Sequence, residues 1–333
     1  MDNLTAAMTT VRPSLDRELS ALVADMPEVP PLNAETLPTI RPFATVDAEV
    51  ALAGHDLDRR DVTVPSFDGA PLPLTILTPA RSGEPRTAVP CIYWVHGGGM
   101  VMGDRFSQID IPLDWLGSFG ATVVSVDYRL APEASGATLV EDCYAGLSWV
   151  ASHADELDID PARVIVAGTS AGGGLAAGTT LLARDRQGPA IAAQVLICPM
   201  LDHRNTTESS RQFTGPAVWS REANEFGWRS VLGDLAYLGD GEVPGYVSPA
   251  LAEDLAGLPT TYVDAGSAEV FRDENVAYAS RIWAAGGQAE LHVWAGGFHG
   301  FDALFPQVQV SKAARAARSD WLSRVLRDAT LTS

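Results

Sequence analysis

Short, mostly apolar runs alternate with longer amphipathic stretches through the middle of the chain. Runs of five to seven such residues are typical of strands that are buried on both faces. The predicted strands are 91–95, 121–127, 163–167 and 191–197, and the predicted helices are 112–119, 137–154 and 171–186. Alternation of this kind predicts a mostly parallel sheet with helices on both faces.

The pattern changes on both sides of this region. Residues 1–55 read as helices broken by a proline-rich piece, and a strand pair near 61–65 and 72–77 follows, with Gly69 between its strands. Strands are predicted again at 260–264 and 289–294, and helices at 273–285 and 307–327. The sheet therefore begins with a hairpin and resumes after a long interruption.

The interruption, residues 202–250, carries several aromatic side chains among polar residues, which favours an inserted subdomain over a flexible linker. We predict N-terminal cap helices over residues 1–55 and a second cap segment over residues 202–250. The catalytic α/β domain then comprises residues 56–201 and 251–333.

Composition excludes several functions. The 333 residues are 46% apolar, which suits a large core, and a formal charge of −19 opposes binding to nucleic acid phosphates. Lys312 is the only lysine and has none of the flanking glycines of a phosphate-binding loop. No apolar run is long enough for a signal peptide or a membrane span, so we expect no membrane contact and a cytoplasmic protein.

The three cysteines, Cys91, Cys143 and Cys198, lie in apolar surroundings, with no C-x-x-C motif and no histidine at metal-ligand spacing. We expect buried free thiols, no metal and no cofactor.

The strongest chemical signal is Gly168-Thr169-Ser170-Ala171-Gly172, between a predicted strand and a predicted helix. A serine nucleophile is presented at such a turn, and small residues two positions to either side let the strand and the helix pass closely. The overlapping run 172–177 also fits a loose dinucleotide pattern, G-x-G-x-x-A. That reading requires an acidic residue at the end of the next strand, 191–197, and none is there.

A serine nucleophile needs donors for the oxyanion that develops in the reaction. His96-Gly97-Gly98-Gly99 directly follows the predicted strand 91–95, and glycines leave backbone N–H groups unshielded. We predict that the oxyanion hole comprises Gly97, Gly98 and the N–H of Ala171. His96 is expected to support this loop rather than to react.

The general base and its orienting acid are expected after late strands, because open α/β sheets gather their sites at the carboxyl ends of strands. His299 follows the last predicted strand, within a glycine-rich run. For the acid, spacing favours Glu269, and Asp264 is the alternative; Asp273 and Glu274 look like first-turn residues of the next helix.

Together these motifs resemble those of the bacterial hormone-sensitive-lipase-like family (family IV) of α/β-hydrolase esterases. The residues that carry the resemblance, over about 60–325, are His96–Gly99, Asp127–Glu133, Gly168–Gly173, Arg272–Glu274 and Phe298–Phe301. The resemblance implies the α/β-hydrolase fold with a helical cap, a catalytic triad of Ser170, Glu269 and His299, and commonly a homodimer. Most relatives carry aspartate at the position of Glu269, so this chain resembles a subset of the family. We interpret Asp127–Glu133 as structural support for the glycine loop.

The predicted function is hydrolysis of short to medium acyl esters of small molecules through an acyl-enzyme, with Phe213, Trp219 and Phe298 bounding the pocket. Fold and triad do not fix the acyl or alcohol group, so lactones, carbamates, amides and acetylated small molecules remain alternatives. A non-catalytic receptor on the same fold is a further alternative, which the presence of His299 disfavours.

Overall fold

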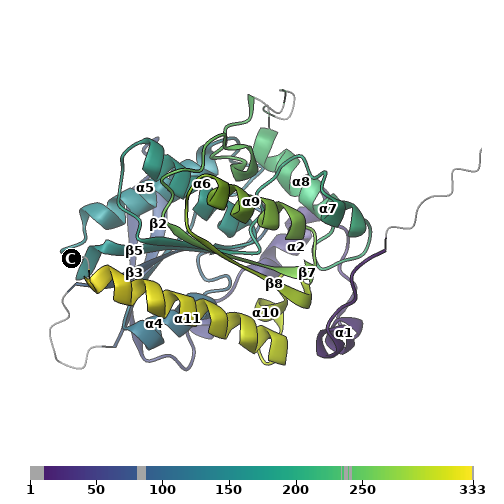
Figure 1. Ribbon diagram of the computed structural model, residues 1–333, viewed down its shortest axis with the longest axis horizontal. Helices are drawn as coiled ribbons and strands as arrows, with labels where there is room; N and C mark the ends of the chain where they lie inside the picture. Colours follow the sequence, from purple (N-terminus) through teal and green to yellow (C-terminus); the bar gives the residue numbers. More distant parts are fainter. Residues whose placement is uncertain (1–10, 81–87, 234, 236–238, 240–241, 332–333) are drawn as a thin grey trace, which may run out of the picture.

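The computed structural model describes residues 11–80, 88–233, 235, 239 and 242–331. They form one central sheet and the helices around it (Figure 1). The strands lie in the order β1-β2-β4-β3-β5-β6-β7-β8. Their bounds are β1 Leu57–Pro65, β2 Pro71–Pro79, β3 Val89–Val95, β4 Thr122–Val126, β5 Ile159–Thr169, β6 Ala193–Ile197, β7 Thr260–Ala268 and β8 Ala289–Phe298. β2 is antiparallel to both β1 and β4, and every other pair is parallel. The mostly parallel sheet predicted from the sequence is confirmed.

Helices cover both faces of the sheet (Figure 1). The described helices are α1 Arg17–Ala24, α2 Leu37–Ile40, α3 Ala48–Ala51, α4 Asp110–Phe119, α5 Thr138–Ser152, α6 Ala171–Asp185, α7 Glu208–Gln212, α8 Arg221–Leu232, α9 Arg272–Ala284, α10 Phe301–Leu304 and α11 Gln309–Leu331. In Figure 1, α5, α6 and α9 lie on one side of the sheet, and α4 and α11 lie on the other. None of the described helices is both long and apolar enough to cross a membrane.

Alternating side chains of the strands divide the core into two layers. On β3, Tyr93 and Val95 pack into the cluster that includes residues of α5, α6 and α9. Ile92 and Trp94 point the other way, into the cluster formed with α4 and α11. Both sets are fully buried, because β3 lies in the interior of the sheet between β4 and β5.

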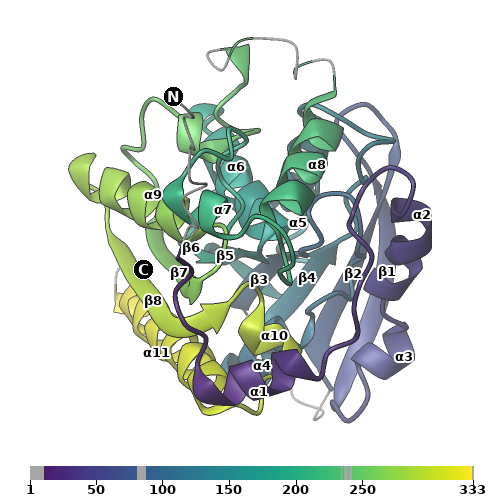
Figure 2. The ribbon, with the colours of Figure 1, turned by 90° about the vertical axis from the view of Figure 1, so that its right-hand side faces the viewer.

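Helices α1, α7 and α8, which come from the described parts of the two segments predicted as caps, lie toward the carboxyl end of the sheet (Figure 1 and Figure 2). Figure 1 shows α7 and α8 at the end of the molecule toward which β7 and β8 point. Figure 2 shows α1 beside α10, and the Asp16 N–H just before α1 donates to the Gly296 carbonyl of β8 at 3.0 Å. Segments far apart in sequence therefore meet near the place where the strands end.

The last two strands extend further than the sequence predicts. β7 continues to Ala268 and β8 to Phe298, past an irregularity next to Gly266, and Ala268 pairs with Phe298. The glycines in these stretches are typical of loops in a sequence. In the structure they lie within the strands and permit close contacts between backbones. A Cβ on Gly266 would lie 2.0 Å from the Gly297 oxygen, and one on Gly296 would lie 2.1 Å from the Asp16 nitrogen.

Candidate active site

Ser170 occupies a strained turn between β5 and α6. Its φ of +56° and ψ of −122° fall outside the regions that a serine normally adopts. The neighbouring glycines make this turn possible, since a Cβ on Gly168 would lie 2.3 Å from the Gly172 oxygen. A Cβ on Gly172 would lie 2.1 Å from the Val95 oxygen of β3. The turn has the geometry of a nucleophile elbow.

The pairing of β7 with β8 brings Glu269 and His299 together. Ala268 pairs with Phe298, so the next residue on each strand begins its loop at the same level of the sheet. His299 Nδ1 lies 2.6 Å from Glu269 Oε2, and His299 Nε2 lies 2.8 Å from Ser170 Oγ. All three residues are at least nine-tenths buried, with exposed fractions of 8% for Ser170, 1% for Glu269 and 9% for His299. The three side chains thus form one continuous hydrogen-bonded chain.

Glu269 is itself held by the backbone, and the alternative acid points elsewhere. The Gly266 N–H donates to Glu269 Oε1 at 2.7 Å, which fixes the carboxylate against the end of β7. Asp264 instead accepts hydrogen bonds through Oδ2 from Trp294 Nε1 at 3.1 Å and from Arg318 Nε at 2.8 Å. Its carboxylate is therefore engaged on the side of the sheet covered by α11.

The protonation of His299 is set by opposing effects. Burial lowers the pKa of the ring, whereas the neighbouring Cys198 sulfur and the Glu269 carboxylate raise it, and the net direction is upward. Burial also raises the pKa of the Cys198 thiol, so the sulfur is neutral at neutral pH. Glu269 is then the charge that favours the imidazolium form of His299.

The glycine loop after β3 departs from the prediction at one position. The N–H of Gly97 donates to Gln108 Oε1 at 3.0 Å, so this donor is already occupied. Gly98 and Gly99 follow with φ of +112° and +62°, and Ala171 is the first residue of α6. Within the described residues, the N–H groups of these last three residues have no acceptor among the recorded bonds. Gln108 belongs to no motif, so the sequence could not predict that its side chain accepts a hydrogen bond from Gly97.

Residues of the predicted supporting loop do contact the glycine loop. The His96 ring stacks on Tyr128 with ring centroids 4.3 Å apart, and the Tyr128 hydroxyl donates to the His96 carbonyl at 2.9 Å. The Ala131 N–H donates to the Met100 carbonyl at 2.9 Å. These bonds connect the segment after β4 to the segment after β3, in line with the structural role expected for residues 127–133.

A cavity of about 210 Å³ lies beside the hydrogen-bonded chain. Phe213, Trp219 and Phe298, the three predicted pocket residues, all line it together with Glu269 and His299. The remaining wall comes partly from the N-terminal segment, through Arg12, Pro13, Leu15 and Val23. Nothing in the spacing of these four residues indicates that role, because they reach the cavity only through tertiary packing.

The tertiary structure also places Cys198 close to the histidine. The sulfur and the ligand atoms of Glu269 and His299 lie within 4.8 Å of one another, a grouping capable of holding a metal ion. However, both ring nitrogens of His299 and both oxygens of Glu269 already make hydrogen bonds. The arrangement fits a base with its orienting acid better than a metal centre. All three cysteines are free and buried, as predicted.

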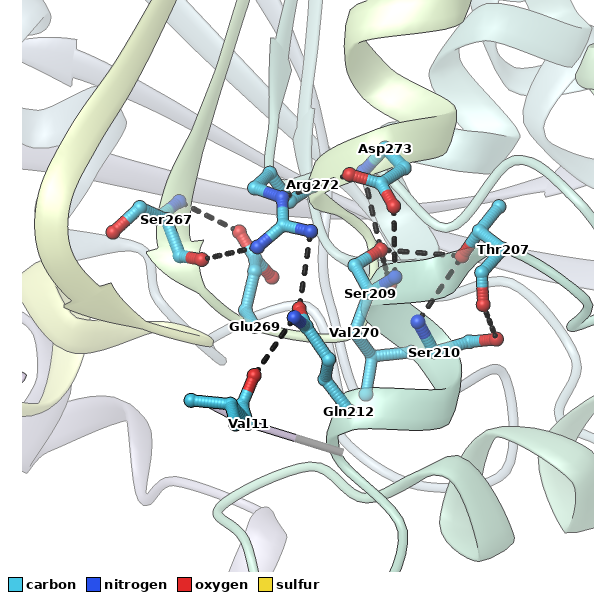
Figure 3. A network of polar contacts seen from close by, with 11 residues as sticks. Val11, Thr207, Ser209, Ser210, Gln212, Ser267, Glu269, Val270, Arg272 and Asp273 are labelled. Carbon is cyan, nitrogen blue, oxygen red and sulfur yellow. Dashed lines mark hydrogen bonds and ion pairs between the residues drawn. The ribbon is translucent and has the colours of Figure 1, made fainter. Parts of the chain in front are cut away.

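The Arg-Asp-Glu motif at the start of α9 fastens the inserted segment to the loop that carries Glu269 (Figure 3). Arg272 donates to the Ser267 carbonyl at 2.9 Å and to Gln212 Oε1 at 3.1 Å. Asp273 accepts from the Ser209 N–H at 2.7 Å. The buried Glu274 accepts from the Leu201 N–H at 2.7 Å. Two residues expected to begin a helix thus also fix the segment that follows β6.

This fold is that of an α/β hydrolase. The profile of a family described as alpha/beta hydrolase fold (Abhydrolase_3) matches residues 92–303. The chain therefore belongs to the hormone-sensitive-lipase-like family of α/β hydrolases.

Several relatives are named as esterases. The chain is 34% identical over 258 residues to carboxylic ester hydrolase LipN of Mycobacterium tuberculosis, covering 75% of this chain and 65% of that protein. It is 34% identical over 203 residues to esterase LipI of the same organism, covering 61% of this chain and 62% of that protein. The matches thus span slightly less than two thirds of these curated relatives.

Solved structures match over nearly the whole chain. A bacterial heroin esterase superposes with a TM-score of 0.86 at 37% identity, covering 94% of this chain and 98% of that one. Esterase LipW of Mycobacterium marinum superposes with a TM-score of 0.82 at 31% identity, covering 95% of this chain and 99% of that one.

Proposed function

We propose that the protein is a serine carboxylesterase that hydrolyses esters through an acyl-enzyme intermediate. The observation that carries this proposal is the buried chain from Ser170 Oγ to His299 and on to Glu269, at 2.8 and 2.6 Å. The esterase names of the relatives and of the superposed structures support the same reaction class.

In the proposed reaction, Ser170 Oγ attacks the ester carbonyl while His299 Nε2 takes its proton. Glu269 holds the imidazole in the tautomer that leaves Nε2 free and stabilises the imidazolium that forms. His299 then returns the proton to the leaving alcohol, which gives the acyl-enzyme. Water, activated by the same base, attacks the acyl-enzyme and releases the acid.

The oxyanion of each tetrahedral intermediate needs donors that are not already bonded. We assign this role to the N–H groups of Gly98, Gly99 and Ala171. Gly97, predicted from sequence, is replaced by Gly99 because the Gly97 N–H already donates to Gln108 Oε1 at 3.0 Å.

The proposed substrates are short to medium acyl esters of small molecules. A cavity of about 210 Å³ that is lined mainly by apolar side chains supports this size range. In this proposal residues 1–55 and 202–250 form the cap over residues 56–201 and 251–333. Residues 1–10, 81–87, 234, 236–238, 240–241 and 332–333 of these ranges lie outside the described part of the chain. We further propose that the protein acts in the cytoplasm as a homodimer, without a cofactor.

Replacement of the nucleophile tests the reaction. Ser170→Ala should reduce hydrolysis of 4-nitrophenyl acetate by about 10⁶-fold, to the level left by binding and the oxyanion donors. The exposed Ser152→Ala on α5 is the matched control and should retain the parental rate. A fluorophosphonate reagent should label the parent and the control but not Ser170→Ala, as read by intact mass. Parental activity in Ser170→Ala would show the proposed reaction to be wrong.

A further inference from the structure

Arg12, a positively charged residue, lines the cavity together with Glu269 and His299. Its guanidinium is held by three backbone carbonyls of the inserted segment. Nε donates to the Gln212 oxygen at 2.7 Å, Nη1 to the Pro216 oxygen at 2.9 Å and Nη2 to the Thr214 oxygen at 2.5 Å. The Phe213 ring lies below it, 5.2 Å from Cζ. The group is therefore fixed in position and direction.

No carboxylate of the described residues forms an ion pair with this guanidinium. Other arginines at the cap and the core, such as Arg41 and Arg272, have a carboxylate within 2.8 Å. Carbonyl oxygens orient the guanidinium, but they do not neutralise its charge.

The guanidinium also has hydrogen-bonding capacity left. Arginine carries five N–H donors in a planar fork, of which the three carbonyls use three. One N–H therefore remains on each of Nη1 and Nη2, and a carboxylate, with two acceptor oxygens and a negative charge, is a partner that arginine binds well. The apolar wall that includes Leu15, Val23 and Phe298 would take the hydrocarbon between such a carboxylate and the ester bond.

We propose that Arg12 makes the site selective for esters that carry a carboxylate on the part of the molecule remote from the bond that is cleaved. Half-esters of dicarboxylic acids and acetylated aromatic acids belong to this class. The inference rests on the proposed esterase function and adds a specificity-determining residue to it.

The test compares matched neutral and anionic esters. One pair varies the acyl group, 4-nitrophenyl pentanoate against the 4-nitrophenyl half-ester of glutaric acid. The other pair varies the alcohol group, phenyl acetate against 4-acetoxybenzoate. The quantity measured is the ratio of kcat/KM for the anionic ester to kcat/KM for the neutral ester. The ratio of each variant is then divided by the ratio of the parent, because this cancels the difference in intrinsic reactivity between the two esters.

Arg12→Met should lower this ratio at least tenfold in one of the two pairs of esters. The difference in the ratio between parent and variant should shrink as salt is added, because Arg12 is exposed to solvent and its charge is screened. Arg12→Lys keeps the charge without the fork and should retain part of the preference. Arg17→Met removes an exposed charge five residues away on α1, does not line the cavity, and should leave the ratio unchanged.

Two results would overturn the inference while leaving the esterase function intact. In the first, Arg12→Met hydrolyses neutral esters and its ratio equals that of the parent in both pairs. In the second, Arg12→Met and Arg12→Lys lose activity equally on neutral and anionic esters, which would make Arg12 only a fastener of the N-terminal segment. Failure of the parent to hydrolyse any of the four esters, neutral or anionic, would instead refute the proposed function itself.

Discussion

At the scale of single residues, Glu269 does two things to His299 that can be separated by experiment. Its carboxylate holds Nδ1 at 2.6 Å, and its charge raises the pKa of the ring against the lowering effect of burial. The neighbouring Cys198 contributes to the electrostatic environment of the ring but makes no contact with the nucleophile among the recorded bonds. The orientation of the His299 ring by Glu269 affects kcat. The charge of Glu269 affects the pH above which His299 is neutral and can accept a proton.

Glu269→Gln should therefore change both the rate and its pH dependence. The rate should fall by about 10³-fold to 10⁴-fold, because the amide favours the wrong tautomer of His299. The active form has a neutral ring, so activity rises with pH through the pKa of His299. Removal of a charge that raises this pKa should move the acidic limb of kcat/KM to lower pH.

The measurement is a pH profile of kcat/KM for the parent and for Glu269→Gln on the same ester. The control is Asp264→Asn, which removes a buried carboxylate that is bonded to Arg318 and Trp294 and should leave the acidic limb near its parental position. A profile for Glu269→Gln that keeps the parental limb and rate would contradict the assigned role.

At the scale of elements, a buried charge cluster ties α11 to the middle of β7 and to the start of α10. Arg318 of α11 donates to Asp264 at 2.8 Å and also bonds Asp302 of α10, three residues after His299. Arg318 and both acids are almost completely buried. Burial raises the pKa of Asp264 even though Arg318 opposes this effect. The cluster therefore links α10, which follows His299, to β7, which precedes Glu269, on the side of the sheet that α11 covers.

Arg318→Met should destabilise the fold by about 3–5 kcal/mol at neutral pH, because it leaves Asp264 and Asp302 buried without a cation. Without Arg318 the pKa of Asp264 should rise further above its unfolded value. Such a carboxyl is least unfavourable when it is protonated, so the difference in unfolding free energy between parent and variant should shrink as pH falls.

Urea unfolding of both proteins at several pH values checks this expectation. The triple variant Arg318→Met, Asp264→Asn, Asp302→Asn removes the charges together and should recover part of the lost stability. A difference that grows toward low pH would contradict the proposed cause of the destabilisation.

At the scale of the whole molecule, β8 forms one edge of the sheet and has no neighbour beyond it among the described strands. Apolar side chains remain exposed near this edge, with Val293 of β8 at 42% and Trp283 of α9 at 46%. An unpaired strand with apolar neighbours is a surface that proteins usually cover. In the proposed homodimer, this edge would be covered by the second copy of the chain.

Light scattering after size exclusion should give twice the chain mass of 35.3 kDa. Val293→Lys should shift the protein toward the monomer, because it places a charge on the edge strand. Val50→Lys on α3 changes a side chain that is 71% exposed and should leave the mass of the particle unchanged. A parent that stays monomeric at all concentrations would remove the dimer from the proposal.

The motifs and the order of elements could be predicted because each depends on neighbours in sequence. The apolar runs located β3 to β6 to within a few residues, and the glycines around Ser170 indicated the turn after β5. The ends of β7 and β8 could not be located, since glycines that look like a loop here serve close contact between backbones. The sequence also could not show that the N–H of Gly97, predicted as an oxyanion donor, is bonded to Gln108, eleven residues away.

The sequence by itself determined the α/β architecture, the turn that carries Ser170 and the order of Ser170, Glu269 and His299 along the chain. Those features follow from periodicity and from local steric demands, which a sequence displays directly. Only the tertiary structure decided that Glu269 rather than Asp264 contacts His299 and that Arg12 lies at the cavity. Such contacts join residues far apart in the chain, so they depend on strand register and packing, which no local pattern encodes.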